Sequence, residues 1–521
     1  MILDAEKGFG HEPPRYDLCI VGAGAAGITL ALELEATGLR VCLLEAGGAE
    51  YESETQRLFE GEVVGQEYPM LRDTRVGVLG GSTTVWAGWC RPLEALDFES
   101  WPFGLDELRP YYARAHEICG LAAGDYDAER WSTVLGPDRI LPGNPAFSSE
   151  IFHIQVQDFG QRYREWLRRS KNIDLVLHAP VTRARMEGSV CTAVEIRTLG
   201  GNELTIRADR FVLAAGGVEN PRLLLLSGDE PAGAPGNAGG LVGRYFADHA
   251  FVDPGTLVLR APDSLDFYRA RPVAPTRGAS SVRGVLSLRR GVAERERLMN
   301  AALYFHPRYE AHRVFATGEV KAWLTLWNKR KQRAVPGAEW PYLRQAMRAP
   351  HRLAVALARK LVVRHGPARR WRMRGAFETE FQYDNRVKLS DERDRLGRRR
   401  VLIEWQIGDA DVENMRRVTQ LFDEAVRQAS LGHLERAFPD TPAAWRQAVE
   451  PAKHHMGTTR MHVASQHGVV DENSRVHGTS NLYVAGSSVF PGGGYANPTL
   501  TIVALAARLG DHLKRTPHAL M

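Results

Sequence analysis

Residues 16–47 read YDLCIVGAGAAGITLALELEATGLRVCLLEAG. The apolar run Tyr16–Val21 predicts a short buried strand, and the glycines follow it at once. ITLALELEATG then predicts a helix that ends near Gly38, and RVCLLEAG predicts a second buried strand. A GxGxxG motif placed between a strand and a helix, with a second strand after it, predicts a Rossmann-type dinucleotide site.

Each glycine of this motif has a physical role in such a site. Gly22 allows the tight turn, Gly24 lets the backbone approach a pyrophosphate, and Gly27 lets the helix pack closely on the strand. The pyrophosphate is expected at the positive end of the helix. Glu45, at the end of the second strand, is placed to accept hydrogen bonds from the adenosine ribose. A carboxylate there argues against NADP and leaves NAD and FAD open.

Length and composition indicate an ordinary globular chain. At 521 residues, two or three domains of about 100 to 200 residues each are expected. No window approaches 18 consecutive apolar residues, and the N-terminus lacks the apolar core of a secretory signal, so a cytoplasmic protein is expected. The five cysteines show no CxxC pair and no metal-ligand spacing, so buried thiols and no metal site are expected.

Positive charge is concentrated in one stretch, residues 329–374, which holds 14 Lys or Arg and one acid, Glu339. The leucines and alanines in it recur at helical spacing, and we interpret the stretch as a solvated helical face. A peripheral membrane surface, an acidic partner subunit or an anionic substrate are the alternatives for this charge. Nucleic acid is not expected, because no nucleic-acid-binding motif accompanies it.

Residues 175–228 are predicted to bring the chain back beside the first Rossmann unit. Residues 175–228 indicate a strand meander with a turn at Gly200 and Gly201, then a buried strand, FVLAAGG, and a helix that begins near Asn220. We therefore predict an α/β fold with a discontinuous Rossmann-like cofactor domain, residues 1–250 and 454–521. Residues 251–453 are predicted to form a substrate domain with a mainly antiparallel sheet and helices.

The C-terminal block, HHMGTTRM…NLYVAGSSVFPGGGYANPTLT, predicts a second part of the nucleotide site. NLYVAG predicts a strand, GGGYAN a loop able to approach a planar ring, and the residues after it a helix with Pro498 at its first position and Asn497 at its N-cap. The positive end of that helix would stabilise negative charge on a reduced ring.

GAGAAG, the stretch GGSTTVWAG at residues 80–88 and the C-terminal block together resemble the glucose-methanol-choline (GMC) family of FAD oxidoreductases. The wording is most similar to the pyranose oxidase and bacterial sugar dehydrogenase branch. In that branch a GG-x-[ST]-T-H-W pattern supplies a histidine that can bond covalently to FAD, and here Val85 stands at that position. The resemblance therefore implies non-covalent FAD, with Trp86 packed near the flavin.

The resemblance also implies the catalytic groups. The histidine of H-x-x-G is His454, and its partner some forty residues later is Asn497. A neutral imidazole could remove the hydroxyl proton as hydride leaves for flavin N5, and Asn497 would orient the oxygen. His455 is the rival base, and His249 is expected to support the fold.

The residues expected to contact the cofactor come from both ends of the chain. They are Gly22, Gly24, Ala25, Ala26, Gly27, Glu45, Ala46, Gly81, Ser82, Thr83, Trp86, Ala87, Gly88, Val181, Ala215, Gly486, Ser487, Asn497, Pro498 and Thr499.

By this resemblance the expected activity is FAD-dependent oxidation of a sugar, polyol or glycoside hydroxyl to a ketone or aldehyde. The flavin would be reoxidised by dioxygen or another acceptor. An aminoglycoside or other natural-product alcohol is an alternative, for which Glu378, Glu380 and Asp384 are the candidate pocket acids. A FAD-containing lyase without net redox and an NAD-dependent dehydrogenase are the remaining alternatives.

Overall fold

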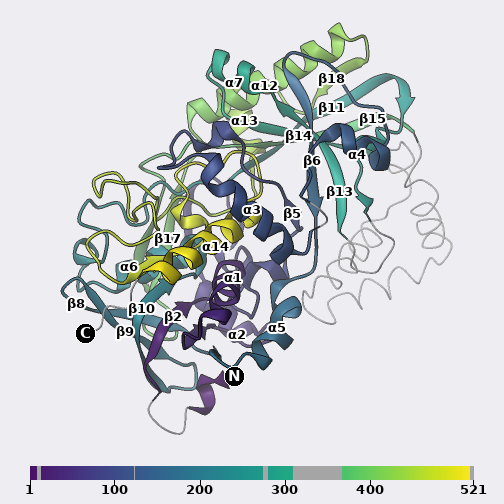
Figure 1. Ribbon diagram of the computed structural model, residues 1–521. Helices are drawn as coiled ribbons and strands as arrows, with labels where there is room; N and C mark the ends of the chain where they lie inside the picture. Colours follow the sequence, from purple (N-terminus) through teal and green to yellow (C-terminus); the bar gives the residue numbers. More distant parts are fainter. Residues whose placement is uncertain (9–12, 122–123, 274–279, 309–366, 517–521) are drawn as a thin grey trace, which may run out of the picture.

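Figure 1 shows the computed structural model, which describes residues 1–8, 13–121, 124–273, 280–308 and 367–516. An α/β part that contains both ends of the chain lies beside a second part built on a large sheet. The α/β fold class is therefore confirmed, and so is the contribution of both chain ends to the nucleotide-binding part. The domain boundaries at residues 251 and 453 stay a prediction.

The central sheet of the first part has the strand order β1-β7-β3-β2-β10-β9-β8, and β20 also pairs with β10. β10 is parallel to β2 and β20 over its second half and antiparallel to β9 over its first half. The strands are β1 (Ile2–Asp4), β2 (Tyr16–Val21), β3 (Val41–Leu44), β7 (Ile173–Leu177), β8 (Val181–Glu187), β9 (Val190–Arg197), β10 (Glu203–Leu213) and β20 (Leu482–Val484). The near-continuous apolar sequences of β2, β3, β7 and β20 are typical of strands that are covered on both faces.

Helices from distant parts of the chain cover this sheet. α14 (Thr499–Arg515) lies against α1 (Ala25–Leu34) and α3 (Leu105–Cys119), and the Tyr112 hydroxyl of α3 is 2.9 Å from Thr501 Oγ1. The other helices of this part are α2 (Ser53–Gln56), α5 (Phe159–Arg169) and α6 (Gly216–Leu226). α14, α1 and α3 thus form one packed layer (Figure 1).

Two predicted helix starts differ from the structure. α6 begins at Gly216 and not near Asn220, because two glycines let its first turn pass the His455 carbonyl oxygen: a Cβ on Gly217 would lie 2.2 Å from that atom. α14 begins at Thr499, so Pro498 takes the N-cap position and Asn497 precedes it. The shift of one residue leaves the positive end of the helix at the loop that holds Asn497.

The large sheet of the second part has the order β18-β11-β15-β14-β13-β6-β5, and all neighbouring pairs are antiparallel. Two short strands pair at its edges, β12 with β13 and β19 with β11. The strands are β5 (Trp89–Cys90), β6 (Phe147–Ile154), β11 (Ala250–Asp263), β12 (Arg271–Pro272), β13 (Ser281–Leu288), β14 (Ala301–Arg308), β15 (Ala368–Phe377), β18 (Gly432–Arg436) and β19 (Glu450–Pro451).

Helices pack against this second sheet. Phe422 of α12 contacts Phe147 of β6 and Phe305 of β14, with ring centroids 6.0 and 5.6 Å apart. The helices are α4 (Ala128–Leu135), α7 (Arg290–Glu296), α12 (Asp409–Gln428) and α13 (Pro442–Ala448). The predicted antiparallel sheet with helices is therefore present.

NRVKLSD and RRVLIEW form strands, as predicted, but they lie in a separate small sheet. β16 (Arg386–Arg393), β17 (Arg399–Trp405) and β4 (Gly61–Gly65) make up this sheet, in which β17 and β4 are parallel. It packs on α6 and so joins residues of the middle of the chain to the first part.

Residues 329–366 of the basic stretch lie outside the described residues, so the helical face predicted there is untested. The end of the stretch, from Ala368, belongs to strand β15. Within the described part of the chain, no helix is long and apolar enough to cross a membrane.

Candidate active site

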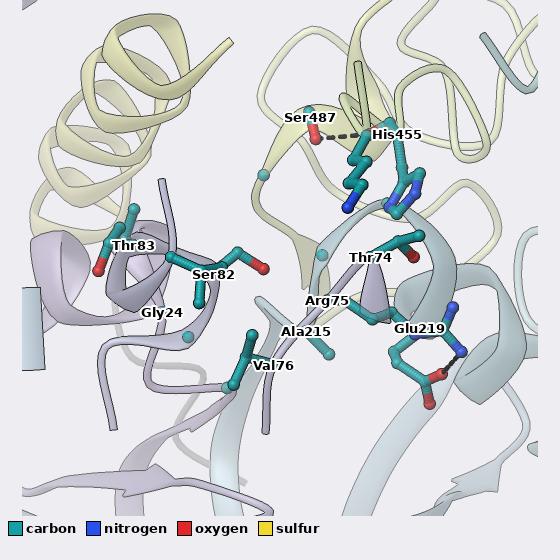
Figure 2. A pocket seen from close by; sticks show the side chains of 18 of the residues that line it. Gly24, Thr74, Arg75, Val76, Ser82, Thr83, Ala215, Glu219, His455 and Ser487 are labelled. Atoms are coloured by element: carbon teal, nitrogen blue, oxygen red, sulfur yellow. Dashed lines mark hydrogen bonds and ion pairs between the residues drawn. The ribbon is translucent and has the colours of Figure 1, made fainter. Parts of the chain in front are cut away.

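A cavity of about 1090 Å³ opens at the carboxyl ends of the parallel strands β2, β3, β10 and β20. Glycine turns follow three of these strands, so backbone and not side chain borders the cavity there. Figure 2 shows Gly24 and Ser82 on one side of the cavity and Arg75 and Glu219 across from them. Every residue predicted to contact the cofactor lines this cavity, with the exception of Gly27.

Gly27 lies behind the cavity and closes α1 onto the first turn. A Cβ on Gly27 would be 1.9 Å from the carbonyl oxygen of Gly22, so only glycine allows this approach. Gly22 itself has φ +112°, and its Cβ would lie 2.5 Å from Ala214 O. The roles predicted for both glycines agree with this geometry.

Glu45 is fixed at the end of β3 by backbone amides. Its Oε2 accepts from Ala23 N and its Oε1 from Gly47 N, each at 3.1 Å. Burial raises the pKa of Glu45 to about 7, although the Gly47 and Ala23 amides act in the opposite direction. A carboxylate held in this way still has lone pairs for donors of a ligand in the cavity.

A 3-10 turn, η5 (Gly81–Thr84), forms the side of the cavity opposite Glu219. The Thr83 hydroxyl donates to Gly80 O at 2.6 Å and accepts from Phe159 N at 3.0 Å, which locks the turn. Beyond the turn, Val85 is 53% exposed, and Trp86 lies edge-on to Phe159.

His454 meets the ends of two other side chains in the cavity region. Asn497 Nδ2 lies 3.2 Å from His454 Nε2, and His249 Nδ1 lies 2.9 Å from His454 Nδ1. An amide nitrogen only donates, so His454 Nε2 accepts and the ring proton sits on Nδ1, where it is donated to His249. The Nε2 lone pair beside Asn497 is therefore the basic position of the site.

Burial keeps the pKa of His454 well below its ordinary value of 6.5, and His249 and His455 add to this effect. Burial likewise lowers the pKa of His249 to about 4. Both rings are thus neutral at neutral pH, as general-base catalysis by His454 requires.

Comparisons with known proteins bear on this geometry. Residues 382–506 match the family model described as GMC oxidoreductase, and residues 17–226 match the model described as FAD dependent oxidoreductase. The chain is therefore similar to the GMC oxidoreductase family. It is an FAD-dependent alcohol oxidoreductase.

Several relatives and solved structures align with nearly the whole chain. It is 24% identical to 2-methyl-1,2-propanediol dehydrogenase of Mycolicibacterium austroafricanum, covering 96% of this chain and 95% of the relative. It is 22% identical to the fructose dehydrogenase large subunit of Gluconobacter japonicus, covering 96% and 98%. The crystal structure of pyridoxine 4-oxidase from Mesorbium loti superposes with a TM-score of 0.60 at 17% identity, over 97% of this chain and all (100%) of that one.

The cavity fits FAD on structural grounds. In the described part of the chain, several buried nitrogens that border the cavity have no hydrogen-bond partner: Trp86 Nε1, His455 Nε2, and Nε and Nη1 of Arg75. Donors of this kind suit a long ligand with phosphate, hydroxyl and carbonyl oxygens. Gly24, Gly81, Glu45 and Gly486 are among the residues that would hold it, from the pyrophosphate turn to the C-terminal block.

Asp248 is a site residue that sequence reasoning missed. Its carboxylate accepts from His454 N at 2.8 Å, from Lys453 N at 2.9 Å and from the Tyr68 hydroxyl at 2.6 Å. Lys453 has φ +68°, a conformation that these bonds help to hold. Burial raises the pKa of Asp248 to about 6. The only sequence signal was its position beside His249.

His455 has different side-chain neighbours from His454. Its ring packs against Tyr68 and Phe246, with centroids 6.1 and 5.9 Å away. Burial, Arg75 and Lys453 lower its pKa to about 3. Asn497 is hydrogen-bonded to His454 and has no bond to His455.

The acids named for an amino-sugar substrate lie elsewhere. None of Glu378, Glu380 and Asp384 lines the cavity. Glu378 Oε1 accepts from Gly494 N at 2.8 Å and from Gly493 N at 3.3 Å, so it holds the glycine loop from behind. The Asp384 side chain is 97% exposed. No group of His, Cys, Asp or Glu that could hold a metal ion occurs among the described residues.

Proposed function

We propose that this chain oxidises a hydroxyl of a sugar, polyol or glycoside to a ketone or aldehyde, with His454 as the general base and Asn497 as the group that orients the alcohol oxygen. The observation that carries the proposal is the Nε2 lone pair of a neutral His454, 3.2 Å from the Asn497 amide in the cavity. The base and its partner come from segments 43 residues apart, which the fold brings into contact.

His454, Asn497 and the positive end of α14 have separate roles in the proposed reaction. His454 Nε2 takes the hydroxyl proton, and the Asn497 amide donates to the oxygen without competing for that proton. The positive end of α14, at Pro498 and Thr499, borders the cavity and favours negative charge there. FAD, when bound, supplies the hydride acceptor at flavin N5.

The substrate class is supported by the names of similar proteins, a propanediol dehydrogenase and a fructose dehydrogenase. Both names describe compounds with more than one hydroxyl group. The electron acceptor is proposed to be dioxygen or another small oxidant. The narrower likeness to the pyranose oxidase branch stays a prediction.

We further propose that FAD is held without a covalent bond at position 85. Val85 borders the cavity and its aliphatic side chain has no atom able to bond to the flavin methyl group. Trp86, next in the chain, presents an unpartnered ring nitrogen within the described structure, so it is suited to pack near the cofactor.

The experiment that tests the proposal is anaerobic reduction of the bound flavin by a panel of sugars and polyols in the His454→Ala variant. We expect FAD to stay bound and the rate of flavin reduction to fall about 10²- to 10⁴-fold, the usual contribution of a general base. Stopped-flow absorbance at the oxidised flavin band is the measurement.

Two further variants make the result specific. His455→Ala removes the rival histidine and is expected to slow reduction far less than His454→Ala. His462→Gln, in the same C-terminal block but outside the cavity lining, is the matched control. An unchanged rate in His454→Ala would remove that residue from the role, and a wild-type flavin that no alcohol reduces would favour a non-redox lyase.

A further inference from the structure

The wall of the cavity that belongs to the large sheet is aromatic and cationic. Its lining residues are carried by β5, β11, β14 and β15, and none of them is acidic: Trp89, Phe251, Tyr304, His306 and Arg374. Trp89 and Tyr304 stack edge to face at 5.2 Å. This wall is formed by the second part of the molecule, whereas the glycine turns belong to the first.

Arg374 and His454 contact the same aromatic ring, that of Phe251. The guanidinium carbon of Arg374 is 4.8 Å from the centre of the Phe251 ring, and the centre of the His454 ring lies 6.4 Å from that of Phe251. Both Arg374 and His454 line the cavity, so one ligand can contact the two residues.

Two acids contact the arginines of this wall, and water screens one of them. Arg374 and Arg372 share one carboxylate, Asp253, at 3.6 and 3.4 Å. The second acid bound to Arg374, Glu450, has a side chain that is 66% exposed, so water screens it. One shared carboxylate and one solvated carboxylate leave room for a further anion.

A third arginine adds positive charge from behind the wall. Arg283 is buried, and its guanidinium lies over Trp89 at 5.1 Å and over Tyr304 at 5.9 Å. It donates to the carbonyl oxygens of Tyr268 and Phe305, and it has no ion pair with any described residue. A cation without a paired acid in a buried place attracts an anion strongly.

His306 completes the wall as a neutral group. Burial is the main cause that lowers its pKa, to about 3, and Arg283, Arg372 and Arg374 add to it. A neutral imidazole can donate one hydrogen bond to an oxygen without adding charge.

We propose that the substrate alcohol carries an oxyanion, a carboxylate or a phosphate, which Arg374 and His306 bind while the hydroxyl meets His454 and Asn497. This inference rests on the proposed alcohol oxidation and narrows its substrate to hydroxy acids or phosphorylated polyols. A cationic alcohol is disfavoured, because it would have to approach the same guanidinium.

The first test compares matched substrates that differ in the anion only. Gluconate is paired with glucitol, and glycerol phosphate with glycerol, in anaerobic flavin reduction. We expect the anionic member of a pair to reduce the flavin at a lower half-saturating concentration. A neutral member that is equally good or better overturns the proposal and leaves alcohol oxidation standing. The two pairs also distinguish carboxylate from phosphate.

The second test measures binding without turnover. Succinate, which has no hydroxyl to oxidise, is titrated into the holoenzyme, and its dissociation constant is read from the change in the flavin spectrum. If succinate binding depends on Arg374 but no alcohol reduces the flavin, the proposed oxyanion site is supported and the proposed alcohol oxidation is overturned. Absence of succinate binding at concentrations where the anionic alcohol saturates would overturn the site.

Variants locate the site. Arg374→Gln is expected to weaken binding of succinate and of the anionic alcohol about 10- to 100-fold, with no loss for the neutral alcohol. Arg370→Gln is the control, because Arg370 lies on the same strand, pairs with Glu435 and does not line the cavity. Equal loss in both variants, or equal loss for neutral and anionic alcohols, would overturn the assignment.

Discussion

At the scale of the residue, His454 owes its unprotonated state to burial and to neutral partners. Both of its ring nitrogens meet nitrogen atoms, Asn497 Nδ2 and His249 Nδ1, so no carboxylate stabilises a protonated ring. Its backbone amide, in contrast, is held by the Asp248 carboxylate. The Asp248 carboxylate thus holds the main chain at His454, while burial of the imidazole, together with His249 and His455, keeps its pKa low.

His249 is expected to set the tautomer of this base. In His249→Ala the Nδ1 proton of His454 loses its acceptor, and we expect flavin reduction to slow about tenfold, the value of one hydrogen bond of ~1.4 kcal/mol. His249→Asn, whose carbonyl oxygen can accept the same proton, should recover part of the rate. A variant that merely loosened the fold would not be rescued in this way.

The pH dependence of flavin reduction tests the contact between His249 and His454 in a second way. A neutral His454 is the active form, and its pKa lies well below 6.5, so the rate of flavin reduction in the wild type should not fall until the pH is below that value. In His249→Asp the new carboxylate favours the protonated ring and should move the acidic limb to higher pH. An acidic limb that does not move would contradict the direct contact.

At the scale of the element, the ends of the parallel strands decide what the cavity presents. β2 ends in a glycine turn, while β3 ends in Glu45, whose two oxygens are held by the Ala23 and Gly47 amides. Because burial raises the pKa of Glu45 from 4.5 to about 7, the folded chain keeps this proton at a pH where the unfolded chain has lost it. Ionisation of Glu45 therefore lowers the free energy of unfolding as the pH rises from 4.5 to about 7.

FAD affinity should follow the same titration. Ribose hydroxyls that donate to Glu45 favour the carboxylate, so binding releases a proton, and the dissociation constant for FAD should fall as the pH rises towards about 7 and level off above it. Fluorescence titration of the apoprotein with FAD is the measurement. In Glu45→Gln this pH dependence should disappear, and a variant with the wild-type profile would assign the proton to another group.

At the scale of the whole molecule, the cavity joins segments from both ends of the chain and from its middle. Its lining runs from Val21 in β2 to Ile502 in α14 and includes Phe251 and Arg374 of the large sheet. α14 is packed between α1 and α3, and Arg114 of α3 forms ion pairs with Glu33 and Asp511 of the other two helices. A ligand that fills this cavity therefore stabilises contacts across the entire fold.

If FAD is bound without a covalent bond, thermal stability should depend on its concentration. A hundredfold excess over the dissociation constant adds about 2.7 kcal/mol, which corresponds to a rise in Tm of several degrees. Differential scanning fluorimetry with added FAD is the measurement, and acid precipitation should release the flavin into the supernatant. If the Tm does not change with added FAD and the flavin stays on the precipitated chain, the cofactor is bound covalently, which would contradict the inference from Val85.

Features that depend on residues close together in the sequence could be predicted, and features that depend on distant residues could not. The strand, turn and helix at residues 16–34 need only near neighbours, because a Cβ on Gly22 or Gly27 would collide with backbone of the same nucleotide-binding unit. Short motifs with set spacing also marked His454 and Asn497. Glu378 was misinterpreted as a pocket acid because its sequence position does not reveal that it is buried against the amides of Gly493 and Gly494.

The sequence by itself determined the Rossmann unit and the GMC motifs and predicted His454 as the base, since backbone conformation and motif spacing are properties of short segments. Only the tertiary structure decided which charges and hydrogen bonds meet. The contact of His249 with His454 spans 205 residues, and the approach of Arg374 to Phe251 joins two neighbouring strands whose sequences lie far apart. Such pairings depend on burial and on distances between strands, which no local pattern of residues contains.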